Sequence, residues 1–173
     1  QYGIQDVDQE NLRHLIGKPL ADVFYAALPA EHHPLVPQYV ATFRAHYFEH
    51  CVDHTRPYPG VPELLAELRN LGYQLAVATT KRTHMARKVL KELGLTGHFD
   101  WIQGTDELPA KPDPAILHYV CQMLSRSVEE AMMIGDTDND VLAAKRAGMK
   151  SGAVSWGAWH RNQLAVLEPD FLL

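Results

Sequence analysis

Apolar residues at helical spacing dominate the first third of the chain. From Glu10 to about His54 they recur every three or four positions, and no stretch alternates as a half-buried strand would. Breaks in the pattern fall at Gly17-Lys18-Pro19 and between Pro34 and Pro37. The pattern predicts a small, all-helical unit over residues 1–57. The apolar positions that define it are Leu12, Leu15, Ile16, Leu20, Val23, Phe24, Val40, Phe43 and Tyr47.

Strand and helix patterns alternate in the rest of the chain. The segment from Arg56 to Pro62 is rich in Pro and Gly and predicts a linker into this region. Helices are expected over residues 63–70, 82–93, 114–124 and 141–147, and strands over 73–78, 99–104, 131–134 and 151–156. Near-continuous apolar strands that alternate with helices indicate a parallel sheet covered on both faces. We therefore expect an α/β core over residues 58–173.

Composition narrows the class of protein. With 173 residues, 46% of them hydrophobic, the chain can bury the core of one ordinary domain with a small insert. The formal net charge of −5 argues against nucleic acid as a partner, and the apolar runs are too short to cross a bilayer. The polar start, Gln1 to Glu10, does not resemble a signal segment. Only Cys51 and Cys121 are present, without a CxxC motif, so we expect a cytoplasmic protein.

Polar segments follow three of the predicted strands. They are Thr79-Thr80-Lys81, Lys111-Pro112-Asp113-Pro114, and the run from Gly135 to Asp140. Each lies at or near the start of a predicted helix. Ligands of parallel sheets bind outside the carboxyl ends of the strands, so these segments are the candidate site.

The run from Gly135 to Asp140 carries the most specific chemistry. Asp136, Asp138 and Asp140 place three carboxylates within five residues, where they would repel one another unless a cation lay between them. Oxygen ligands of this kind suit Mg²⁺, which also takes waters and phosphate oxygens. The alternative is a solvated acidic turn in which Asp138 caps the helix.

The other two segments suit an anion. Thr79 offers a hydroxyl, and Lys81 an ammonium, beside main-chain N–H groups at a predicted helix start, a combination that binds phosphate. The alternative is a plain threonine cap. Lys111 alone could be a loop lysine in solvent, but near acids and phosphate it would offset their charge.

Together these segments resemble the haloacid dehalogenase (HAD) superfamily of Mg²⁺-dependent phosphohydrolases, and most of all its phosphoglycolate phosphatase group. The stretch from Ile16 to Leu20 is similar to that group's cap segment, and Tyr58-Pro59-Gly60-Val61 to its return into the core. Thr79 matches the family's second motif, Lys111 the third, and the Gly135–Asp140 run the fourth. The resemblance implies a three-layer, Rossmann-like core with a parallel sheet, covered by a small helical cap.

The resemblance also implies roles for the matched residues. Thr79 would bind the transferring phosphoryl group with help from the Thr80 amide, and Lys111 would neutralise the nucleophile and the phosphate. Asp136 and Asp140 form the implied Mg²⁺ site, in which Asp136 ligates the ion and Asp140 supports either the ion or Lys111. The implied activity is hydrolysis of a small phosphorylated metabolite through an aspartyl-phosphate. The family's dehalogenases need no metal, so the acid-rich fourth motif favours a phosphatase.

The family's first motif, an apolar strand that runs into Asp-x-Asp-Gly-Thr, is absent from this sequence. Asp6-Val7-Asp8 has the Asp-x-Asp spacing, but Gln9-Glu10 follow it and too few apolar residues precede it for a core strand. We interpret it as a polar lead-in to the first helix. We therefore expect the central first strand of the sheet, with its nucleophile, to be missing, and the 173-residue chain alone to be inactive.

Two alternative functions stay open at this stage. One is a sugar-phosphate mutase of the same superfamily, and the other is a catalytically inactive module that binds phosphate and Mg²⁺. Lys18, at the first break in the helical unit, is a candidate for contact with the far end of the substrate, although most lysines lie in solvent. The sequence leaves the oligomeric state open.

Overall fold

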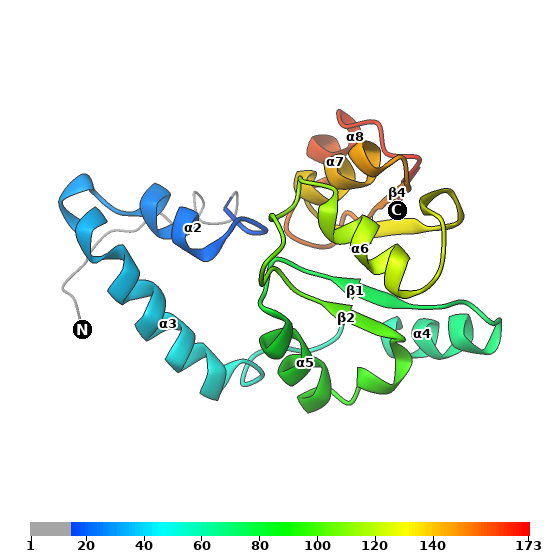
Figure 1. Ribbon diagram of the computed structural model, residues 1–173, viewed down its shortest axis with the longest axis horizontal. Coiled ribbons are helices and arrows are strands. Elements are labelled where there is room, and N and C mark those ends of the chain that lie inside the picture. The colour runs from blue at the N-terminus through cyan, green and yellow to red at the C-terminus, as the bar shows by residue number, and fades with distance from the viewer. Residues whose placement is uncertain (1–14) are drawn as a thin grey trace.

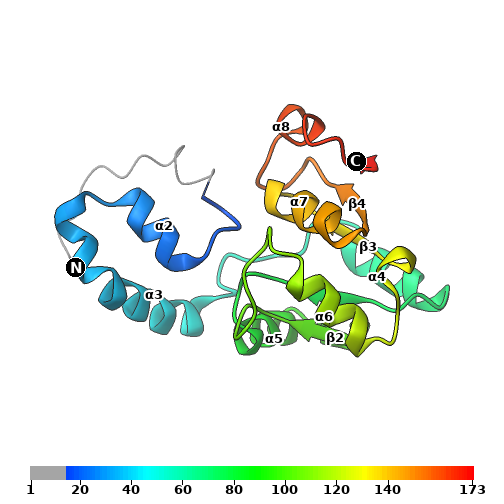
Figure 2. The same ribbon diagram turned by 45° about the horizontal axis from the view of Figure 1, so that its top comes forward.

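The computed structural model describes residues 15–173 (Figure 1). Its first part, up to Arg56, contains helices and turns and no strand. The helices are α2 (Leu20–Ala27), the 3₁₀ helix η1 (Ala30–Leu35) and α3 (Val36–His50). They pack around a small cluster of their own, formed by Leu28, Val36, Tyr39 and Val40. Figures 1 and 2 both show α2 and α3 set to one side of the remaining elements.

The break predicted between Pro34 and Pro37 is only a change of helix type. Pro34 lies inside η1, and Pro37 lies in the first turn of α3, where an N–H has no intrahelical partner. The chain therefore passes from η1 into α3 without a loop. The division into a cap over 1–57 and a core over 58–173 stays a prediction.

The second part alternates helices and strands as expected. In chain order its elements are α4 (Val61–Asn70), β1 (Ala76–Ala78), α5 (Thr83–Glu92), η2 (Thr96–His98), β2 (Trp101–Gln103), α6 (Ala115–Met123), η3 (Val128–Glu130), β3 (Met132–Gly135), α7 (Asp138–Ala147), β4 (Lys150–Ala153), α8 (Arg161–Ala165) and β5 (Phe171–Leu172). The short α8 and β5 had no counterpart in the predicted pattern. Among residues 15–173 all strand pairs are parallel, which confirms the predicted sheet type.

The described strands form two separate sheets. One has the order β1-β2 and the other β3-β4-β5, so within residues 15–173 one edge of β1 and one edge of β3 stay unpaired. Two side chains of β3 are open to solvent, Met132 with 43% and Ile134 with 54% exposure. A further strand between β1 and β3 could therefore form main-chain hydrogen bonds with both unpaired edges.

Helix α6 contacts β1 and β2, helix α7 contacts β3 and β4, and the two helices contact each other. Ile116 and Leu117 of α6 pack with Ala143, Ala144 and other buried residues in the largest cluster. Ala78 of β1 and Met133 of β3 pack against that same cluster. The two helices therefore hold the two sheets side by side and bring the carboxyl ends of β1 and β3 to one edge. In the described part of the chain, no helix has the length and apolar character needed to span a membrane.

Candidate active site

A buried ion pair links the carboxyl end of β1 to the start of α7. Lys111 lies in the segment between β2 and α6, and its ammonium donates to the Ala78 carbonyl at 2.9 Å and to Asp140 Oδ1 at 2.5 Å. Lys111 is only 8% exposed and Asp140 only 6%. Lys111 is therefore not the solvent-exposed loop lysine that the sequence left as an alternative.

Asp140 is held by main-chain donors as well as by Lys111. Its Oδ2 accepts hydrogen bonds from the N–H groups of Asp136 and Thr137, both at 3.1 Å, and from the Thr137 hydroxyl at 2.8 Å. Thr137 caps α7 and Asp140 completes the capping box, so Asp138 is not the cap. A Cβ on Gly135 would overlap the Asp140 side chain, which explains the glycine at the end of β3.

Asp136 is the first residue after β3 and is half-buried. Its Oδ2 accepts a hydrogen bond from the Ala158 N–H at 2.7 Å. Within residues 15–173, Oδ1 of Asp136 has no hydrogen-bond partner. The predicted crowding of three carboxylates is thus relieved in part by Lys111 and by N–H donors, including the Asn139 N–H on Asp138 Oδ1 at 2.8 Å.

Thr79 directly follows β1, next to the carbonyl that Lys111 contacts. Its N–H continues the strand ladder to the Gln103 carbonyl, and its Oγ1 accepts from the Lys81 N–H at 3.2 Å. Thr80 comes next and is half-buried. The structure thus brings Thr79, Thr80 and Lys111 together with Asp136 and Asp140 at the same edge of the fold.

Helix α5 begins at Thr83, one residue after the predicted start at 82, and its N-cap is Arg82, so the alternative of a plain threonine cap at Thr79 is excluded. The Lys81 ammonium lies 5.6 Å from the centre of the Tyr47 ring on α3, a cation–π contact, and its predicted part in phosphate binding stays a prediction.

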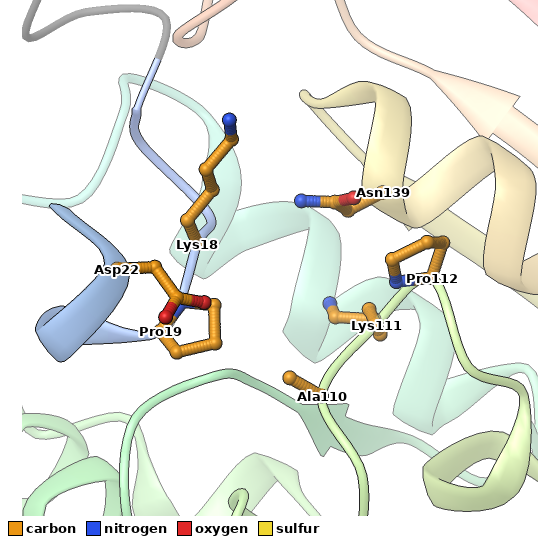
Figure 3. Close-up of a pocket in the computed structure, with 7 residues that line it drawn as sticks. All are labelled: Lys18, Pro19, Asp22, Ala110, Lys111, Pro112 and Asn139. Carbon is orange, nitrogen blue, oxygen red and sulfur yellow. The ribbon is translucent and has the colours of Figure 1, made fainter. Parts of the chain in front are cut away.

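A pocket of about 340 Å³ lies between the start of α2 and this ion pair (Figure 3). Lys18, Pro19 and Asp22 line it from the helical side, and Ala110, Lys111, Pro112 and Asn139 from the α/β side. Beside the pocket the helical side and the α/β side come close together. A Cβ built on Gly17 of the helical side would lie only 3.3 Å from Thr137 Cγ2 of the α/β side. Sequence reasoning named Lys18 and Lys111 and included Asn139 in the Gly135–Asp140 run without giving it a role, but it missed Asp22, which belongs to no motif.

These residues could hold Mg²⁺ if waters and substrate oxygens supplied the rest of its coordination. Among residues 15–173, no three His, Cys, Asp or Glu side chains gather into a metal-binding group. Asp136 Oδ1 is nonetheless a carboxylate oxygen not taken up by a protein donor of the described chain. Mg²⁺ is commonly held by one or two carboxylates, with waters and substrate phosphate oxygens as the other ligands. The carboxylate of Asp136 alone can therefore supply the protein ligand.

A protein-family model described as "haloacid dehalogenase-like hydrolase" matches residues 1–154. The chain belongs to the haloacid dehalogenase-like hydrolase family. The family and the α/β fold predicted from the sequence are therefore confirmed. Asp6 and Asp8, which have the Asp-x-Asp spacing of this family's first motif and were interpreted as a polar lead-in, lie outside the described residues.

Curated relatives of this HAD chain include two bacterial phosphoglycolate phosphatases. The one from Aquifex aeolicus is 39% identical over 137 residues, which cover 79% of this chain and 63% of that protein. The one from Chromobacterium violaceum is 37% identical over 161 residues, 90% of this chain and 72% of that protein. "Pyrophosphatase PpaX" from Halalkalibacterium halodurans is 35% identical over 159 residues, which cover 91% of this chain and 72% of that protein. The matched part thus spans 63% to 72% of these relatives.

Solved structures agree with the HAD fold. A haloacid dehalogenase-like hydrolase from Streptococcus pneumoniae superposes with a TM-score of 0.87 at 28% identity, and covers 98% of this chain and 79% of that one. A β-phosphoglucomutase from Clostridium difficile superposes with a TM-score of 0.76 at 18% identity, which shows a common fold alone.

Proposed function

We propose that this HAD chain is the larger part of a Mg²⁺-dependent phosphatase that hydrolyses a small phosphate monoester of the phosphoglycolate type. The observation that carries the proposal is the buried Lys111–Asp140 pair, which places an ammonium between the ends of β1 and β3. A fixed, desolvated cation is well suited to stabilise a phosphoryl group in transfer. The names of the curated relatives point to the same chemistry.

The proposed roles follow from what each group contacts. Thr79 Oγ1 and the Thr80 N–H would hold oxygens of the phosphoryl group, and Lys111 would neutralise their charge. Asp136 would ligate Mg²⁺ through Oδ1. Asp140 is better suited to hold Lys111 than to ligate the metal, because both its oxygens already accept hydrogen bonds. When bound, Mg²⁺ supplies positive charge that stabilises the phosphate oxygens.

The nucleophile would come from a further strand between β1 and β3. The unpaired edges of these two strands and the exposed side chains of β3 support this placement. By resemblance to the family, an aspartate at the end of that strand attacks phosphorus while the ester oxygen leaves and takes a proton. Water then cleaves the aspartyl-phosphate and releases inorganic phosphate.

The rest of the substrate would lie in the pocket between α2 and Lys111. Its volume of about 340 Å³ is near the lower end of ordinary ligand pockets and suits a small metabolite. Lys18 and Asn139 offer donors there, and Asp22 an acceptor. We also place the reaction in the cytoplasm, because Cys51 and Cys121 are both free and buried.

A phosphate-release assay with phosphoglycolate tests the proposal. We expect the complete gene product to release phosphate in the presence of Mg²⁺, and we expect this release to stop when EDTA removes the metal. The 173-residue chain should bind Mg²⁺ without turnover. Turnover by the 173-residue chain that is lost on Asp6→Asn would reject the missing-strand interpretation. If the complete product binds Mg²⁺ and phosphate but hydrolyses no ester, the binding module is correct instead. Conversion of glucose 1-phosphate into glucose 6-phosphate would indicate the mutase.

A further inference from the structure

The segment between β4 and α8, residues 154–160, closes over the end of β3. The Val154 N–H donates to the Gly135 carbonyl at 2.9 Å, and the Trp159 N–H to the Asp136 carbonyl at 3.2 Å. Between them, the Ala158 N–H donates to Asp136 Oδ2 at 2.7 Å. Two main-chain donors of one segment therefore hold the backbone and the side chain of Asp136, and a third holds the backbone of the preceding Gly135.

Gly157 makes this close approach possible. A Cβ built on Gly157 would lie 2.6 Å from Asp136 Cγ and closer still to Oδ2 and Cβ of the same residue. Carbon atoms do not approach one another so closely without displacement of one partner. Since φ of Gly157 is not in the left-handed region, the requirement for glycine is one of space. Any larger residue must push away either the Asp136 carboxylate or the segment itself.

The segment is itself anchored at both ends. Ser155 donates to the Leu173 carbonyl through its N–H at 3.0 Å and through its hydroxyl at 2.7 Å. The Trp159 ring packs against the buried cluster formed by Val141, Ala153 and Leu164. Because these contacts tie the segment to β5 and to the helices, a side chain at 157 would displace Asp136 more readily than the segment.

We infer that residues 154–160 act as a clamp that positions Asp136 for the metal, with Gly157 and the Ala158 N–H as its two positioning elements. The inference rests on the proposed function, in which Asp136 Oδ1 ligates Mg²⁺. With Oδ2 held by Ala158, rotation of the carboxylate is restricted and Oδ1 is left as the ligating atom. Contacts of this kind behind a metal ligand are worth about 10- to 100-fold in metal affinity.

Gly157→Ala tests the clamp, and Gly97→Ala is its matched control because a Cβ on Gly97 meets no atom within 4 Å. We expect Gly157→Ala to weaken Mn²⁺ binding, followed by electron paramagnetic resonance, by about 10- to 100-fold. In activity assays of the complete gene product, the Mg²⁺ concentration for half-maximal rate should rise by a similar factor, while saturating Mg²⁺ restores most of kcat. Gly97→Ala should leave each of these quantities unchanged.

A double-mutant cycle on thermal stability tests the contact without any metal. In the absence of metal, Gly157→Ala should lower Tm, and the loss should be smaller when Asp136→Gly has removed the opposing side chain. Equal losses in the two backgrounds, or unchanged Mn²⁺ affinity in Gly157→Ala, would overturn the clamp. Wild-type protein that binds no Mn²⁺ at all, with the stability coupling intact, would instead reject the proposed metal role of Asp136.

Discussion

In the complete gene product, Lys111→Met should reduce kcat/KM by about a thousandfold, at the upper end of what removal of one stabilising donor costs an enzyme. The same change should lower the free energy of unfolding by about 3–5 kcal/mol, because it leaves the Asp140 carboxylate buried without its cation. Steady-state phosphate release and urea denaturation measure the two effects. Lys145→Met, which removes an exposed lysine from α7, should change neither.

A double variant separates the two consequences of losing Lys111. In Lys111→Met/Asp140→Asn the buried charge is gone, while the amide oxygen at 140 can still accept from the Thr137 N–H. We expect stability to return most of the way to wild type while activity stays low. Recovery of activity together with stability would show that Lys111 has only a structural role.

Asp136→Asn should abolish Mg²⁺-dependent activity, whereas Asp138→Asn should leave most of it. The amide oxygen at 136 can still accept the Ala158 hydrogen bond, so the variant removes charge with little change in shape. Asp138 is the matched control, because it belongs to the same acidic run and its carboxylate accepts a hydrogen bond from the neighbouring Asn139 N–H. Titration of activity with Mg²⁺ compares the two variants. Equal losses would mean that the acidic run acts through its total charge and not through Asp136.

The predicted elements match the structure where local pattern decides the outcome. Alternating apolar segments predicted the order of helices and parallel strands. The Ala115 N–H bonds to Asp113 Oδ1 just before α6, but the N-cap of that helix is Pro114. The predicted strand over 73–78 was too long. The ladder starts only at Ala76, because the Leu75 N–H bonds to the Asp100 side chain and the Tyr73 N–H turns back to the Leu68 carbonyl.

Contacts between distant segments account for the features that a residue pattern does not reveal. The donor that fixes Asp136 is the main-chain N–H of Ala158, and a backbone group leaves no signature in a residue pattern. Gly157 is visible in the sequence, but a lone glycine after a strand is equally typical of an ordinary turn. The contact of Lys81 also depends on a distant segment. Its ammonium lies over Tyr47, which precedes Lys81 by more than thirty positions in the sequence.

A crystal structure of the complete gene product with Mg²⁺ and orthovanadate would test the central claim most directly, namely that the ends of β1 and β3 form one centre for phosphoryl transfer. We predict vanadate oxygens within hydrogen-bond distance of Thr79 Oγ1 and Lys111 Nζ, and the metal ion bound to Asp136 Oδ1. Vanadate and metal bound away from these three residues would contradict the account.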